Sequence, residues 1–116
     1  MRTSELEGVY LDLAVAICEG LKEENYSEFL AHWQSSVGYR WSSSWIQGGC
    51  LIERERIQIT PGWPGDEHKW VAIKYDHIFD KNKDAFQGGD TPLIAVMRCY
   101  VASKLGDKID IKCKIL

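Results

Sequence analysis

The sequence predicts an α+β fold in which an antiparallel β-sheet packs against two main α-helices, one near each end of the chain. Apolar residues recur at helical spacing near both ends, while aromatic and β-branched residues dominate the middle. Gly- and Pro-rich turns separate the strand-like segments. A length of 116 residues, 45% hydrophobic with five Trp, is enough to bury one core, so we expect one domain over residues 1–116.

The N-terminal helix is predicted over about residues 5–19. Its apolar stripe comprises Leu6, Val9, Tyr10, Leu13 and Ile17. Thr3 or Ser4 would cap the start, and Gly20 suits the position just after the end. Further apolar residues widen the stripe almost all the way round the helix. Such a helix must be covered on more than one side, by the sheet and, in a homo-oligomer, by a second subunit.

The middle of the chain predicts an antiparallel meander. A weaker helical pattern at residues 25–34, which could also be an ordered loop, precedes it. Strand-like segments follow at residues 39–41, 51–60 and 70–75. Gly48-Gly49 and residues 61–66 have the composition of turns.

The C-terminal third predicts a loop, a helix and a strand. Residues 76–90 are polar and predict a long loop that contains Gly88-Gly89. Thr91-Pro92 predicts a sharp helix start, since Thr caps well and Pro at the first position needs no N–H partner. Gly106 would close that helix. Alternation at residues 109–115 predicts a half-buried strand at a sheet edge.

Composition and spacing argue against several classes of function. A net charge of −3 disfavours a non-specific nucleic-acid binder, which needs a basic face. The three His are scattered, the four Cys form no C-x-x-C pair, and no phosphate loop or nucleophile elbow is present. We therefore expect no metal, no cofactor and no enzymatic activity.

The chain also carries no recognisable targeting signal. Nothing near the N-terminus resembles a signal peptide, and the longest apolar run, residues 13–18, is too short to span a bilayer. We expect a protein of the bacterial cytoplasm with reduced thiols and no membrane partner.

The segment at residues 37–49 is the candidate binding region. It combines flat aromatic rings, hydroxyls, an amide and a guanidinium, which together can stack on a ring and hydrogen-bond a polar small molecule. The alternative is that Trp41 and Trp45 are core aromatics and residues 42–44 a simple turn. The predicted ligand contacts are Tyr39, Arg40, Trp41, Trp45, Gln47, Arg54 and Arg98.

The arginines of this set allow two interpretations. On a strand, residues 53–56 would place two acids on one face and two arginines on the other, as in a solvated ladder of cross-strand ion pairs. Alternatively, Arg54 or Arg56 binds an anionic ligand, because a guanidinium fork suits phosphate. Arg98 either pairs with a nearby acid, lies at an interface or points into the pocket.

Three sequence blocks, in order, resemble the NinX-like family of phage and prophage proteins. The central block is residues 44–55, SWIQGGCLIERE; the others are LDLAVA at residues 11–16, with Glu19-Gly20, and TPLIAVMRCYVASKLGD at residues 91–107. Two departures stand out: the family usually has Asp at the position of Ser44 and Pro at that of Cys50. The resemblance implies a phage accessory protein expressed in the host cytoplasm, and no mechanism.

Two functional hypotheses follow. The protein binds and sequesters a small polar ligand, a nucleotide defence signal being one candidate, in a pocket formed between subunits. Alternatively, it is an interaction module that docks on a host or phage protein through exposed aromatics such as Trp63.

Overall fold

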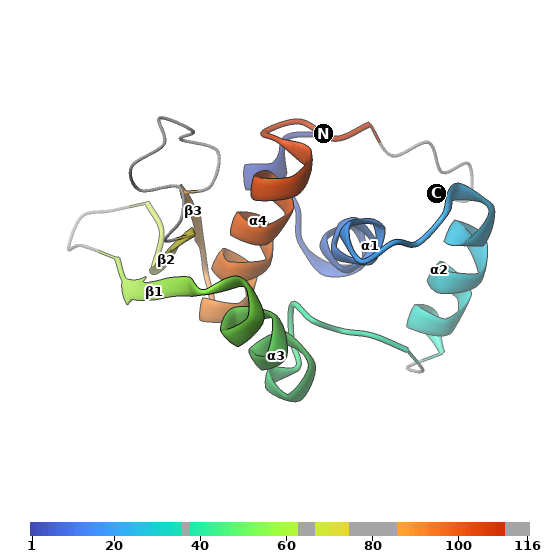
Figure 1. Cartoon of the computed structure of the whole chain (residues 1–116), viewed down its shortest axis with the longest axis horizontal. Coiled ribbons are helices and arrows are strands. Elements are labelled where there is room, and N and C mark those ends of the chain that lie inside the picture. The colour runs from blue at the N-terminus through green and yellow to red at the C-terminus, as the bar shows by residue number, and fades with distance from the viewer. Residues whose placement is uncertain (36–37, 63–66, 75–85, 111–116) are drawn as a thin grey trace.

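The computed structural model describes residues 1–35, 38–62, 67–74 and 86–110 (Figure 1). In these ranges the chain is α+β, with four α-helices and a three-stranded antiparallel sheet. The elements are the 3₁₀ turn η1 (Thr3–Glu5), α1 (Gly8–Cys18), the 3₁₀ turn η2 (Glu23–Asn25), α2 (Tyr26–Gln34), α3 (Trp45–Glu55), β1 (Ile57–Pro61), β2 (Trp70–Lys74), β3 (Phe86–Gly89) and α4 (Pro92–Leu105). No helix within these ranges is long and apolar enough to cross a membrane.

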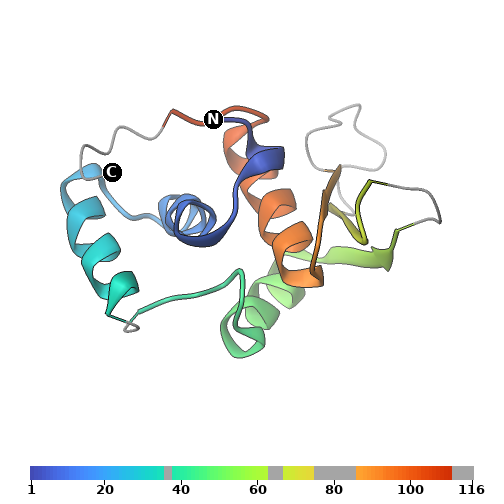
Figure 2. The same ribbon diagram turned by 180° about the vertical axis from the view of Figure 1, so that it is seen from behind.

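Helix α4 lies at the centre of the fold. Its residues 95–102 are all buried, because the sheet packs on one side and α1 on the other, as Figures 1 and 2 show. The predicted start is confirmed: the Thr91 hydroxyl accepts the N–H of Ile94 at 3.2 Å, and Pro92 is the first helical residue. Gly106 closes the helix with φ 86°. The expected packing of both main helices on the sheet is therefore only partly observed, since α1 packs on the far side of α4.

Helix α1 is shorter than predicted and is covered within the chain. The predicted start at residue 5 was wrong: Thr3–Glu5 is a separate 3₁₀ turn, and α1 begins at Gly8, whose φ of 58° breaks the helical path. Neither predicted cap operates, and the Thr3 hydroxyl instead donates to the Gly106 carbonyl. Residues 11–16 are all buried between α4 and α2. The weaker helix predicted at residues 25–34 is confirmed as α2.

Helix α3 overturns part of the predicted meander. The strand expected at residues 51–60 begins only at Ile57, and the Gly48-Gly49 turn lies inside the helix. Residues 39–41 form no strand but belong to the segment that connects α2 to α3. Ser44 caps α3 by accepting the N–H of Gln47, and Arg56 ends it in the left-handed conformation at φ 54°. Ser is among the residues favoured at this cap position, so Ser44 has a structural role at the start of α3.

The three strands confirm the antiparallel meander itself. Their order is β1-β2-β3, with Ile59 opposite Ala72 and Trp70 opposite Gly89. Strand β3 lies where a loop was predicted, because its glycines allow close approach: a Cβ on Gly89 would lie 2.7 Å from the nitrogen of Ala95 on α4.

The turn predicted at residues 61–66 and the loop predicted at residues 76–90 lie partly outside the described residues, and Trp63, the predicted docking anchor, lies wholly outside them. The final strand, predicted at residues 109–115, is described only as far as residue 110. Before that point, Ile109 and Met1 exchange backbone hydrogen bonds of 2.8 and 3.0 Å, so the N-terminal residues run beside the segment that follows α4.

Candidate functional site

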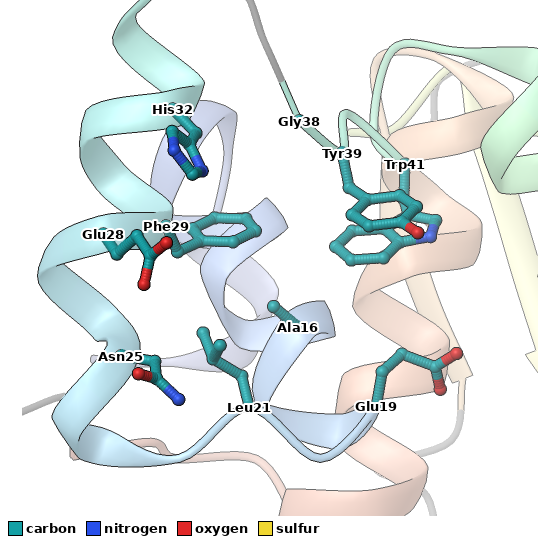
Figure 3. A pocket seen from close by; sticks show the side chains of 10 residues that line it. All are labelled: Ala16, Glu19, Leu21, Asn25, Glu28, Phe29, His32, Gly38, Tyr39 and Trp41. Atoms are coloured by element: carbon teal, nitrogen blue, oxygen red, sulfur yellow. The ribbon is translucent and has the colours of Figure 1, made fainter.

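A pocket of about 590 Å³ lies between α1, α2 and residues 38–41. Figure 3 shows Phe29 and its neighbours on α2 facing Tyr39 and Trp41 across the pocket, with Ala16 of α1 between them. The lining residues are Ala16, Glu19, Leu21, Asn25, Glu28, Phe29, His32, Gly38, Tyr39 and Trp41. The volume falls within the range of small-molecule sites.

Aromatic rings form the apolar part of the pocket. Tyr39 stacks on Trp41 with ring centroids 4.6 Å apart and planes 3° apart. Phe29 lies 6.4 Å from Trp41, centroid to centroid, and its plane is within 7° of parallel. Trp41 is 8% exposed and belongs to the core, whereas Tyr39 is 56% exposed. Trp41 therefore serves both roles that the sequence left open, as a core residue that also lines the pocket.

Buried Asp12 fixes the aromatic segment to the helices. Its Oδ1 accepts the backbone N–H of Ser42 at 2.8 Å, and its Oδ2 accepts the indole N–H of Trp33 at 2.8 Å. Burial raises the pKa of Asp12, while these two donors and the nearby charge of Arg40 act in the opposite direction. One carboxyl thus joins α1, α2 and the segment that carries Trp41.

Arg40 and Gln47 position this segment and do not line the pocket. The backbone N–H of Arg40 donates to the side-chain oxygen of Gln47 on α3. The guanidinium of Arg40 lies 3.9 Å from the ring centroid of Trp33 and donates to the Trp33 carbonyl. Both predicted ligand residues therefore shape the pocket from outside it.

Arg54 belongs to an ion-pair cluster at the edge of the pocket. It holds Glu19 with two hydrogen bonds, of 2.8 and 2.6 Å, and Glu55 with one of 2.9 Å. The Tyr100 hydroxyl also donates to Glu19, and Lys74 pairs with Glu55 at 3.1 Å. The predicted strand ladder is replaced by a cluster that joins α1, α3, α4 and β2.

We expect the Glu19–Arg54 ion pair to stabilise the fold at neutral pH and to lose this effect in acid. The hydrogen bonds from Arg54 lower the pKa of Glu19 in the folded protein. The ion pair therefore contributes fully to the free energy of unfolding above the pKa of glutamate in the unfolded chain, about 4.3, and this contribution is lost as the pH falls through the lower pKa of the folded state. Glu19→Gln should lower stability at pH 7 by up to about 1 kcal/mol, because the pair is partly exposed and screened. The difference in melting temperature between Glu19→Gln and wild type should shrink as the pH is lowered towards 3.

Glu53→Gln is the matched control, since Glu53 is exposed on α3 and has no partner among the described residues. Its melting temperature should follow wild type at every pH. A gap for Glu19→Gln that stays constant from pH 7 to pH 3 would contradict this assignment.

The two remaining predicted contacts lie elsewhere. Arg98 is buried; its guanidinium donates to the carbonyls of Leu6 at 2.7 Å and Gly88 at 2.8 Å, which ties the N-terminal segment to β3. Trp45 is 57% exposed at the start of α3 and does not line the pocket. Of the seven predicted contacts, the structure thus brings only Tyr39 and Trp41 together at the pocket.

Sequence reasoning missed the α2 side of the pocket. Asn25, Glu28, Phe29 and His32 follow the spacing of one helical face. The sequence predicts this helix from a different stripe, Tyr26, Phe29, Leu30 and Trp33, which shares only Phe29 with the face that lines the pocket. No pattern in the sequence indicated that this face opposes Trp41.

The thiols of half-buried Cys18 and buried Cys99 are unsuited to nucleophilic chemistry. Burial raises the pKa of Cys18 and of Cys99 to about 12, so both stay protonated at neutral pH. The described residues also contain no group of three His, Cys, Asp or Glu side chains placed to hold a metal ion.

The comparisons with known proteins agree with the three sequence blocks. The family model described as Bacteriophage P22, NinX matches residues 2–104. A search of curated proteins finds no match. The chain belongs to the NinX family of phage proteins.

Proposed function

We propose that this phage protein is a non-enzymatic accessory factor that binds and sequesters a small polar molecule with a flat ring, as a means of counter-defence in the host cytoplasm. The observation that supports the proposal is the pocket, in which near-parallel rings from α2 and from residues 39–41 lie beside hydrogen-bonding side chains of η2 and α2. Rings supply stacking area, and the amide and imidazole of Asn25 and His32 supply polar contacts.

A thermal-shift screen tests the proposal. The panel contains nucleobases, nucleosides, nucleotides, cyclic nucleotides and ring-bearing amines. A ligand at a hundred times its dissociation constant stabilises the fold by about 2.7 kcal/mol. Tyr39→Ala should remove the shift and destabilise the unliganded protein only slightly, by about 0.5 to 1.5 kcal/mol, because Tyr39 is mostly exposed and its main contact is the stack on Trp41.

Trp45→Ala is the matched control, as it removes an aromatic side chain of almost equal exposure outside the pocket. Its ligand-induced shift should equal that of wild type. A panel without any shift would contradict the proposal, and loss of the shift in Trp45→Ala but not in Tyr39→Ala would move the site to α3.

Protein docking through α3 is the second candidate. Trp45 and the 88% exposed Ile46 are adjacent in the first turn of the helix, and exposed large apolar side chains of this kind anchor interfaces. The Trp45→Ala variant separates the two functions, since it should weaken docking on a host or phage protein and leave ligand binding intact.

A further inference from the structure

The arginines predicted to meet a phosphate are already engaged with other groups. Arg40 lies over Trp33, Arg54 holds Glu19 and Glu55, and Arg98 is bonded to two backbone carbonyls. The described residues that line the pocket include no lysine or arginine. A phosphate in the pocket would thus meet no guanidinium or ammonium partner among them.

Two carboxylates line the pocket, and they differ in whether a positively charged group is bound to them. Glu19 is neutralised by the two hydrogen bonds from Arg54, and in Figure 3 its carboxylate turns away from Phe29 and Asn25. Glu28 is exposed on α2 and has no partner among the described residues. Glu28 therefore contributes an uncompensated negative charge beside Phe29.

The aromatic rings of the pocket and the carboxylate of Glu28 both favour a ligand with a positive charge. The face of an aromatic ring attracts a cation through its quadrupole, and an adjacent carboxylate adds to that attraction. The chain itself contains this combination, since the Arg54 guanidinium lies 5.7 Å from the ring centroid of Tyr100 while it binds Glu19. In the pocket, Tyr39 and Phe29 would supply the ring and Glu28 the carboxylate for a bound cation.

We infer that the pocket selects an organic cation, a flat ring that carries an amidinium, guanidinium or ammonium group, with the ring on the aromatic side chains and the charged nitrogen at Glu28. This inference rests on the proposed function and names the charge of its ligand. It excludes a phosphate-bearing nucleotide as the preferred ligand, because Glu28 would repel the phosphate and no lysine or arginine among the described lining residues would offset that repulsion.

Three isosteric probes test the inference: benzamidine, benzamide and benzoate, titrated by calorimetry into the full chain. Benzamidine should bind about tenfold more tightly than benzamide, the combined size of a cation–π contact and an exposed ion pair, and benzoate should bind most weakly. Glu28→Gln should weaken benzamidine binding about three- to fivefold and leave benzamide binding unchanged.

Glu24→Gln is the matched control, because it removes the same charge from an exposed residue of the neighbouring η2 turn that does not line the pocket. It should bind all three probes as wild type does. If benzoate binds as tightly as benzamidine while Tyr39→Ala still abolishes binding, the pocket stands and the inference fails. If neither these probes nor the wider panel bind, the proposed function fails with it.

Discussion

Gly48→Ala should destabilise the protein by about 1 to 3 kcal/mol, although alanine normally favours a helix over glycine by about 1 kcal/mol. A Cβ on Gly48 would lie 2.6 Å from the carbonyl oxygen of Trp41 and 2.8 Å from a methyl of Leu93. The first of these neighbours is backbone and cannot turn aside. The substitution should therefore push α3 away from α4 and move Trp41, which lines the pocket.

Gly49→Ala is a matched control in the same helix. A Cβ at Gly49 would meet nothing within 4 Å, so this variant should gain about 0.5 to 1 kcal/mol from helix propensity alone. Urea unfolding followed by tryptophan fluorescence gives both free energies. Equal stabilities of the two alanine variants would contradict the close packing of α3 on Trp41 and α4.

Asp12→Ala should cost about 2 to 4 kcal/mol, because it leaves two N–H donors without an acceptor. These donors are the indole of Trp33 and the backbone of Ser42, and Asp12 itself is fully buried. A loss of this size corresponds to a fall in melting temperature of roughly 4 °C per kcal/mol. The segment that carries Trp41 should also lose its hydrogen bond to α1 through the Ser42 N–H, which would weaken ligand binding in the protein that remains folded.

Asp12→Asn separates the hydrogen bonds from the volume of the side chain. Asparagine keeps the shape but turns its NH₂ group towards one of the two donors, so it should also destabilise, by about 1 to 3 kcal/mol. An asparagine variant as stable as wild type would show that only the volume matters at this position, and the role assigned to the carboxylate would be wrong.

The helices and strands that the sequence predicted correctly have capping or turn residues that mark their ends. Thr91-Pro92 and Gly106 bound α4, and the turn composition after Pro61 separates β1 from β2. Helix α3 was missed because Glu53-Arg54-Glu55-Arg56 alternates as a strand does and has no apolar residue to establish a helical period. Tertiary packing favours the helix here, because Gly48 and Leu51 are both buried and Gly48 lies directly against Trp41 and α4.

The pocket was only partly predictable for the same reason. Tyr39 and Trp41 stood out as aromatics beside glycine, and the structure places them at the pocket. Arg54 and Arg98 were predicted from their chemistry, but their guanidinium groups bind Glu19 and the Leu6 carbonyl, which lie 35 and 92 residues away in the chain. Long-range pairing of this kind leaves no periodic signal.

The most direct test of the proposed site is an NMR titration of the isotope-labelled full chain with benzamidine. We expect chemical-shift changes centred on the ring resonances of Phe29, Tyr39 and Trp41, with Glu28 among the affected amides, and none at Trp45 or Ile46. Changes centred on Trp45 and Ile46, with the three pocket rings unmoved at saturating ligand, would contradict the proposed site.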